Sequence, residues 1–312
     1  MDKTCQATTL KGQPCTRLAK NGNFCGLHSK DKVAKAVKTC VKCSKKVKYG
    51  SLCGSHYKEA HQDDALEETI TITFCEIAEN HIGNQQIGSS VNEGFTVKDL
   101  VIIQSTFMTH GYHCEMIDLT KHLTDHTVSE ASVLIVRNFA VSDRLLEEQK
   151  SLTFDTKCKM YGRVVNKKKR HNLCYGEEAQ AADYEAGKGT VVAFRDLPEL
   201  SKVKNRLAEL IGEKARNLVA EGNYYYDLRT TSIPYHSDLE RKRVIGLRLG
   251  AVMSLYFQWF LDSKPIGDRV TIDLNHLDMY IMSEKAVGFD GRKKKIPILR
   301  HAAGREYAMN FD

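Results

Sequence analysis

Cysteine and histidine residues cluster at the N-terminal end of the chain, and their spacing constrains the fold there more than any other feature. Six of the ten cysteines lie in the first 53 residues, where they form two sets with histidines, C-x9-C-x9-C-x2-H and C-x2-C-x9-C-x2-H. The two sets are Cys5, Cys15, Cys25 and His28, and Cys40, Cys43, Cys53 and His56. Four thiolate and imidazole ligands are what a tetrahedral structural zinc site requires, so each set predicts one zinc ion.

The segment around these ligands has little apolar surface of its own. A stretch of about 25 residues rich in Lys, Gly and Thr cannot offset its ordering entropy, whereas zinc binding supplies roughly 10–16 kcal/mol. Both sets end in Cys-Gly-x-His, where the glycine permits a tight turn around one ion. We therefore expect residues 1–64 to form zinc-binding modules whose core is the metal, the alternative being free thiols.

Positive charge is concentrated in the same segment. Residues 1–64 hold 13 Lys and Arg against 5 Asp and Glu, whereas residues 65–312 hold 33 against 34. Such a surplus suits the phosphate backbone of nucleic acids, although lysines also keep a small module soluble. We expect nucleic acid as a partner of residues 1–64, with the solubilising role as the alternative.

The composition of the whole chain is that of a globular protein. Apolar residues make up 42% and charged residues 27% of the 312 residues, a balance that excludes collagen-like and wholly disordered chains. No apolar run approaches the roughly 18 residues needed to span a bilayer, and no apolar signal segment opens the chain. After residue 53 the cysteines are scattered singly, so disulfides are not expected. We expect an intracellular protein, cytoplasmic or nuclear, without membrane contact.

The pattern of apolar residues changes along the chain. Thr69–Ile77 alternates β-branched residues and predicts a strand, Thr96–His110 has helical spacing, and Ser201–Val219 predicts one or two helices. We interpret residues 69–150 as a small α/β accessory region. From Tyr224 onward, short apolar stretches alternate with turns, which indicates an antiparallel sandwich or barrel. These stretches are Val244–Leu249, Val252–Phe260, Arg269–Leu274, Met279–Met282 and Ile296–Leu299.

A His-x-Asp pattern falls in this second half. His236 and Asp238 share one side of an extended strand, because side chains two residues apart point to the same face. With a second histidine they complete a 2-His-1-carboxylate triad, which leaves coordination positions of Fe(II) open. His301 lies 65 residues downstream of His236, at the end of a predicted strand. The pattern alone is weak, and a surface histidine beside an acidic turn is the alternative.

The sequence around this pattern resembles the catalytic barrel of AlkB-like Fe(II)/2-oxoglutarate dioxygenases. In that family an Asn-x-Tyr stretch leads to His-x-Asp, and a strand ending in Leu-Gly comes next. Here Asn223-Tyr224-Tyr225 precedes His236, and Leu249-Gly250 follows Asp238.

Three further segments extend the resemblance to residues 155–304. His276-Leu277-Asp278 is similar to the family's His-Gly-Asp strand, with leucine in place of the glycine. Gly162–Leu173 and Ile296–Gly304 resemble a viral, algal and fungal branch of these oxygenases. The resemblance implies an α+β protein whose residues 151–312 form a double-stranded β-helix, or jelly-roll, catalytic core with flanking helices.

The resemblance also implies that His236, Asp238 and His301 bind Fe(II). His276 is the rival for the second histidine, and for it we expect a structural role in the core. We prefer His301, because the 40 residues between His236 and His276 leave little room for the intervening strands.

The cosubstrate implied by the resemblance is 2-oxoglutarate, whose far carboxylate needs a cation, ideally a guanidinium. In AlkB-like enzymes this arginine lies well after the distal histidine, whereas here 11 residues follow His301. The candidates are Arg248 and Arg300, and Tyr225 matches the family tyrosine that would bond the same carboxylate. Arg248 interrupts an apolar strand, so it points either into the barrel or to a polar outer face.

The sequence contains two basic runs, Lys167–His171 and Arg292–Lys295. Runs of charged residues most often lie on the solvent-exposed surface. In AlkB-like enzymes a basic and aromatic segment before the barrel orders the substrate. Tyr161, Tyr175 and Arg163 are residues of the type that stacks on bases or binds phosphates.

The reaction implied by the resemblance oxidises 2-oxoglutarate with O₂ to succinate and CO₂ and hydroxylates or demethylates a macromolecule. Nucleic acid is favoured over protein because residues 1–64 are basic. One alternative is a hydroxylase of Lys or Pro side chains in proteins, distinguished by which substrate stimulates succinate release. The other is a non-enzymatic, zinc-dependent nucleic-acid-binding protein with a degenerate barrel, distinguished by the absence of iron at His236.

We predict that residues 1–64 fold only with zinc and bind two ions per chain, since two four-ligand sets lie in a segment with too little apolar surface to fold alone. Cys25→Ser and Cys53→Ser should each remove one ion, as measured by metal analysis of the purified protein. A stoichiometry near zero, or a circular dichroism spectrum that chelation leaves unchanged, contradicts the prediction.

Overall fold

The computed structural model describes residues 15–16, 43, 67–81, 83–140 and 142–306. The chain divides into two compact units, Met1–Asp64 and Ala65–Asp312. Apart from Cys15 and Cys43, the ligands of the two expected zinc sites lie outside the described residues, so these sites stay predictions.

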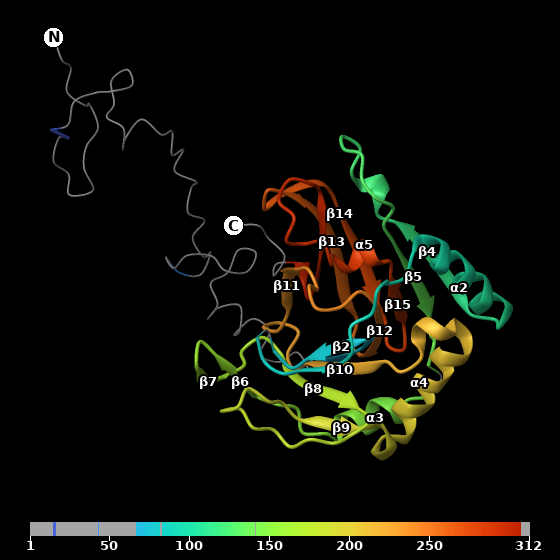
Figure 1. Ribbon diagram of the computed structural model, residues 1–312, viewed down its shortest axis with the longest axis vertical. Helices are drawn as coiled ribbons and strands as arrows, with labels where there is room; N and C mark the ends of the chain where they lie inside the picture. Colours follow the sequence, from blue (N-terminus) through green and yellow to red (C-terminus); the bar gives the residue numbers. More distant parts are fainter. Residues whose placement is uncertain (1–14, 17–42, 44–66, 82, 141, 307–312) are drawn as a thin grey trace, which may run out of the picture. The chain divides into compact units, whose positions relative to one another are not determined.

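The second unit is a mixed α+β structure built mainly from strands in two large sheets (Figure 1). The larger sheet has eight strands in the order β4 (His113–Asp118), β5 (Ser132–Arg137), β15 (Met279–Met282), β12 (Val244–Gly250), β1 (Thr69–Cys75), β10 (Val219–Tyr225), β8 (His171–Gly176) and β9 (Val191–Ala193). The smaller sheet has four strands in the order β11 (Ile233–His236), β16 (Ile298–Ala303), β13 (Met253–Leu261) and β14 (Lys264–Leu274). Neighbouring strands pair antiparallel except β8 and β9.

Two hairpins and several helices complete the unit. The hairpins are β2 (Ile77–Glu79) with β3 (Gln86–Gly88), and β6 (Lys157–Met160) with β7 (Arg163–Asn166). The α-helices are α2 (Val97–Thr109), α3 (Arg144–Lys150), α4 (Pro198–Ile211) and α5 (Glu284–Val287), and the 3₁₀ turns are η1 (Thr120–His122), η2 (Phe194–Asp196) and η3 (Glu213–Ala215). None of the helices within the described ranges is both long and apolar enough to cross a membrane.

Strand β1 lies at the centre of the larger sheet, hydrogen-bonded to β10 on one side and to β12 on the other. Its sequence, Thr-Ile-Thr-Ile-Thr-Phe-Cys, alternates because its two faces have different neighbours: Ile70, Ile72 and Phe74 join an apolar core, while Thr71 and Thr73 line a cavity. The expected separation of residues 69–150 from residues 151–312 is therefore wrong. Local patterning does not reveal which distant strands a segment pairs with.

Helices α2, α3 and α4 cover one face of the larger sheet (Figure 1). Their apolar residues, among them Leu100, Phe107 and Leu207, pack against that face and are fully buried or nearly so. Helix α2 begins with a capping box, in which Thr96 and Asp99 satisfy each other's backbone amides. The helical spacing of Thr96–His110 predicted this helix correctly.

The other face of the larger sheet packs against the smaller sheet. A second core fills the space between them and contains Phe257 and Trp259 of β13, Leu299 of β16 and Val133 of β5. The second unit thus has three layers: helices, the eight-stranded sheet and the four-stranded sheet.

Two expected element boundaries differ from the structure. The helical pattern from Ser201 to Val219 is interrupted at Gly212, whose φ of 85° ends α4, and Val219 already begins β10. The last strand was expected over Ile296–Leu299, but β16 continues to Ala303, so His301 lies within the strand rather than after it.

We predict that Leu100→Ala lowers the free energy of unfolding by about 2–5 kcal/mol, because it opens a cavity between α2 and the larger sheet. Ile102→Ala removes a side chain of the same composition from the same helix, but Ile102 is 66% exposed. This control should change the free energy by no more than about 0.5 kcal/mol. Urea denaturation measures both, and equal effects would contradict the layer arrangement.

Candidate metal centre

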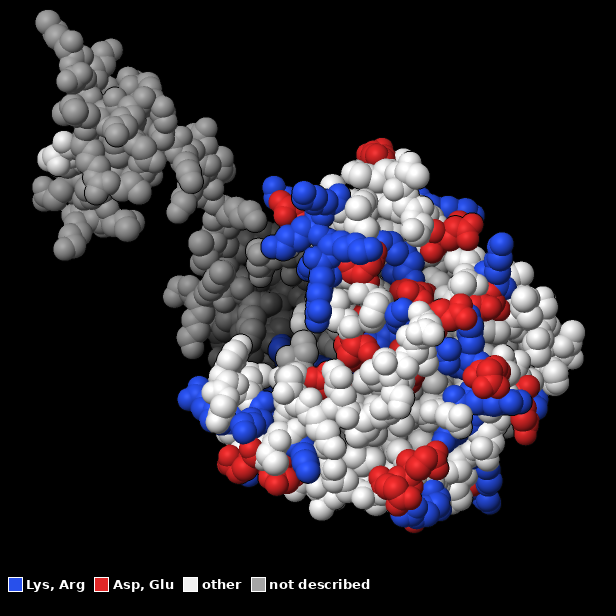
Figure 2. All heavy atoms as spheres, in the orientation of Figure 1, with Lys and Arg blue, Asp and Glu red and all other residues white. Residues whose placement is uncertain are grey.

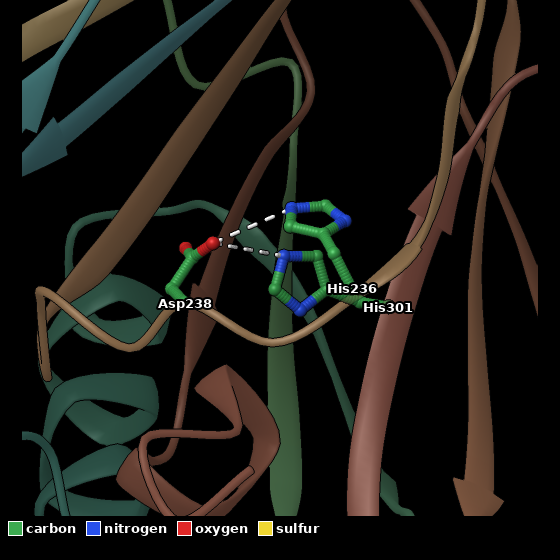
Figure 3. Close-up of side chains that lie close together, drawn as sticks. All are labelled: His236, Asp238 and His301. Carbon is green, nitrogen blue, oxygen red and sulfur yellow. Dashed lines mark ion pairs between the residues drawn. The ribbon is translucent and has the colours of Figure 1, made fainter. Parts of the chain in front are cut away.

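Two histidines of the smaller sheet and an aspartate from the loop after β11 converge on one point (Figure 3). His236 ends β11 and pairs in register with His301 of β16, which places the two imidazoles side by side with ring centroids 4.3 Å apart. Asp238 follows two residues after His236. One nitrogen or oxygen from each of the three lies within 4.8 Å of the other two.

Both histidines present Nε2 to the same carboxylate oxygen. Nε2 of His236 lies 3.3 Å and Nε2 of His301 lies 3.8 Å from Oδ1 of Asp238. Nδ1 of His236 is 2.9 Å from the carbonyl oxygen of Pro234. Because a carbonyl oxygen can only accept, Nδ1 carries the proton, and in the neutral ring Nε2 has a free lone pair directed at this point.

The backbone around Asp238 is held by the end of α5 and by β16. The amide of Asp238 donates to the carbonyl of Val287 at 3.2 Å, and Oγ of Ser237 donates to the carbonyl of Leu299 at 3.2 Å. A Cβ at position 291 would lie 2.5 Å from Ser237, so glycine is needed for this close approach. The backbone position of Asp238 is therefore fixed by packing on both sides.

Electrostatics favour the protonation states that a metal needs. Burial alone would raise the pKa of Asp238, but Arg241 and the two histidines hold it well below its usual range. Burial, together with the nearby His236, lowers the pKa of His301 to about 3. A charged carboxylate beside a neutral imidazole is the state in which both groups are metal ligands.

The three side chains open into a cavity of about 330 Å³ between the two sheets. Its other wall is the inner face of the larger sheet, where Asn223 of β10, Thr71 of β1 and Arg248 of β12 lie opposite one another in register. Tyr225 of β10 lines the cavity as well. The cavity is therefore built from strands far apart in the sequence.

Arg248 points into this cavity. The sequence had left two directions possible for this side chain, into the barrel or toward a polar outer face, and the structure shows the first. Its side chain is fully buried, and Nη1 donates to Oγ1 of Thr71 at 2.5 Å. Among the described residues none accepts a hydrogen bond from Nε or Nη2. Burial lowers the pKa of this guanidinium. A buried charge that is not ion-paired costs several kcal/mol, and two nitrogens of this guanidinium have no acceptor among the described residues.

Arg300 does not reach the cavity. It neighbours His301 on β16, so the two side chains point to opposite faces of the sheet. Its guanidinium lies over the ring of Phe260, 4.5 Å from the centroid, and Arg300 is not among the described residues that line the cavity. The interpretation of Arg300 as a cosubstrate ligand is therefore wrong.

His276 is hydrogen-bonded as we expected, but it lies near the surface rather than in the core, with a side chain that is 28% exposed. Its Nδ1 accepts a hydrogen bond from the amide of Gly250 at 3.0 Å, and its Nε2 lies 3.0 Å from Oδ1 of Asp143. Both ring nitrogens are thus engaged away from the cavity.

The residues proposed to contact a substrate fall in different places. Tyr161, at the tip of the β6–β7 hairpin, is 93% exposed, but Tyr175 is fully buried and bonds Gln149 at 2.6 Å, so it cannot stack on a ligand. Burial lowers the pKa of Lys167 to about 8, and its Nζ bonds Asn80 at 2.7 Å. Of the same basic run, Arg170 lines the cavity.

Sequence reasoning missed a buried polar network behind the metal ligands. Arg241 bonds Glu221 at 2.9 Å, and Glu221 accepts a bond from Asn223 at 3.0 Å. Asn223 in turn accepts a bond from Arg170 at 2.6 Å. The sequence of β10 could have predicted part of this network, because Glu221 and Asn223 occupy one face of an otherwise apolar strand. No pattern in the residues around Arg241 indicated that its side chain is buried.

Comparison with known proteins gives one clear relationship. The sequence matches no protein-family model. It is 46% identical over 246 residues to the uncharacterized protein R156 of Acanthamoeba polyphaga mimivirus, an alignment that covers 77% of this chain and 96% of the relative.

We predict that His301→Ala abolishes tight binding of Mn(II), used as a redox-stable probe, because it removes one of three converging donors. His276→Ala should leave Mn(II) affinity unchanged, since this ring is engaged by Gly250 and Asp143. Electron paramagnetic resonance of free Mn(II) measures both. The reverse result would show that the metal ligands are assigned wrongly.

Proposed function

We propose that this chain, which belongs to the same family as the mimivirus protein R156, is an Fe(II)- and 2-oxoglutarate-dependent dioxygenase. One observation carries the proposal: a 2-His-1-carboxylate cluster shares a cavity with a fully buried arginine, two of whose nitrogens have no acceptor among the described residues. Such a pair of features fits a metal and an anionic cosubstrate bound side by side.

The donor set fits Fe(II). Two imidazoles and one carboxylate, with the remaining coordination positions open, are typical of non-haem Fe(II) oxygenases. A structural zinc site would instead have four protein ligands, and the described residues around this cluster supply three.

The wall opposite the cluster fits 2-oxoglutarate. Nε and Nη2 of Arg248 can donate in parallel to a carboxylate, which is the bidentate geometry that guanidinium groups favour. Thr71 holds the guanidinium by its third nitrogen, and Tyr225 lines the same cavity. These groups would bind the far carboxylate, so that the oxo-acid end faces the metal.

The order of the strands supports a double-stranded β-helix. From β10 to β16 the chain contributes β10, β12 and β15 to the larger sheet and β11, β13, β14 and β16 to the smaller one. A jelly roll of eight strands requires one more strand in the larger sheet. Strand β1 occupies that position, between β10 and β12, from the opposite end of the domain.

Bound Fe(II), 2-oxoglutarate and O₂ would supply the oxidation, with decarboxylation to succinate and insertion of oxygen into a C–H bond. The protein's residues bind and orient. Arg248 anchors the cosubstrate, Asp238 stays ionised as the anionic ligand, and the two sheets exclude water from the reacting groups.

A nucleic-acid substrate is supported by two basic segments near the metal ligands. The carbonyl of Lys169 accepts a bond from the amide of Ser232, which precedes β11, and Gly291, which precedes the run Arg292–Lys295, packs on Ser237. Figure 2 shows Lys and Arg side chains gathered over the region of β13 and β14. Phosphates contacting these segments would bring a base toward the cavity.

We predict that Arg248→Met weakens 2-oxoglutarate binding to the Mn(II)-loaded protein by about 10- to 100-fold, the loss expected for a hydrogen bond to a charged group worth about 1.5–3 kcal/mol. The ligand-free variant should be at least as stable as the wild type in urea, because an unpaired buried charge is replaced by an apolar side chain. Arg300→Met is the matched control and should bind 2-oxoglutarate normally. Unchanged binding in Arg248→Met would contradict the anchoring role.

Turnover tests the proposed reaction directly. His236→Ala and Asp238→Ala should abolish succinate release from 2-oxoglutarate in the presence of Fe(II) and O₂. Stimulation by single-stranded oligonucleotides rather than by lysine-rich peptides would support a nucleic-acid substrate, and the opposite result would favour protein hydroxylation. If none of these variants changes succinate release, the chain is not this enzyme.

A further inference from the structure

The two oxygens of the Asp238 carboxylate face different partners. Oδ1 is the atom nearest to both imidazoles, at 3.3 and 3.8 Å. Oδ2 lies 3.6 Å from Nε of Arg241. The carboxylate is therefore divided between the histidine cluster and a buried guanidinium, with one oxygen for each.

Arg241 is itself fixed by several contacts. Its Nη2 donates to Glu221 at 2.9 Å and to Glu240 at 2.6 Å, and its Nη1 contacts Sγ of Cys75 at 3.3 Å. The side chain is 6% exposed. These contacts come from β10, from the end of β1 and from the neighbouring residue, so the guanidinium cannot follow the carboxylate if it rotates.

We propose that Arg241 is a positioning residue that restricts Asp238 to coordination through one oxygen, which keeps a metal position open for the cosubstrate. A carboxylate can bind a metal through one oxygen or two. With Oδ2 paired to Arg241, only Oδ1 is available. The inference rests on the proposed function and adds to it a residue that lies outside the His-x-Asp pattern.

Loss of Arg241 should lower the affinity for 2-oxoglutarate more than the affinity for the metal. Without Arg241, Oδ2 can turn to the metal and occupy a position that 2-oxoglutarate needs. Metal affinity then persists while cosubstrate affinity falls. A residue that only supported the fold would lose both together.

The test compares Mn(II) and 2-oxoglutarate binding in the full-length protein. Arg241→Gln alone leaves Glu221 buried without its cation, so the double variant Arg241→Gln/Glu221→Gln is measured with it. Arg241→Lys restores the charge without the planar fork. Arg243→Gln is the matched control, because this guanidinium bonds the carbonyls of Glu93 and Lys214 away from the metal ligands.

We expect the double variant to bind Mn(II) as the wild type does and to bind 2-oxoglutarate at least about 10-fold more weakly, a change of about 1.4 kcal/mol in the free energy of cosubstrate binding. The Mn(II) resonance spectrum of the variant should differ from that of the wild type, and Arg241→Lys should lie between them. Arg243→Gln should match the wild type in every measurement.

Two results would overturn the inference alone: wild-type 2-oxoglutarate affinity in the double variant, or a parallel loss of Mn(II) binding and cosubstrate binding. If the wild-type protein itself bound neither Mn(II) nor 2-oxoglutarate, the proposed function would fail and the inference with it.

Discussion

Strand β1 pairs with β10 along one edge and with β12 along the other, and this double antiparallel ladder holds the inner wall of the cavity in register. Asn223, Thr71 and Arg248 face the cluster of His236, Asp238 and His301 as one row because three strands place them side by side. The same strand carries isoleucines on its outer face, which join the core beneath α2 and α4. The cavity wall and the helix-packed core therefore depend on a single segment.

The two buried arginines differ in whether their charge is balanced by nearby carboxylates. Arg241 has carboxylates on several sides, so its burial is compensated and it contributes a fixed geometry. Arg248 is buried as deeply but bonds one threonine hydroxyl among the described residues. The buried guanidinium of Arg248 lowers the stability of the free protein, and an anion bound beside it would remove that cost. Proteins typically sacrifice some stability at sites where binding requires a charge that is already in position.

Local patterns in the sequence predicted individual elements well. The helical spacing of Thr96–His110 located α2 within a residue at each end, and the alternation of threonine and isoleucine located β1. The downstream histidine of the expected triad was chosen by sequence distance, and the structure brings that residue, His301, to His236. Arg300, one residue before His301, was misjudged because the sequence did not reveal which residues of that strand face inward.

The sequence by itself determined which segments form strands and helices and which residue types could hold a metal, because these properties depend on neighbours a few positions apart. Only the tertiary structure decided that β1 belongs with strands more than 140 residues away, that Arg248 points inward, and that Arg241 lies behind Asp238. The physical reason is that strand pairing and the direction of a buried side chain depend on the sheet as a whole. The alternation of apolar and polar residues along a strand predicts that its two faces differ, but the packing of the whole sheet determines which face lines the cavity.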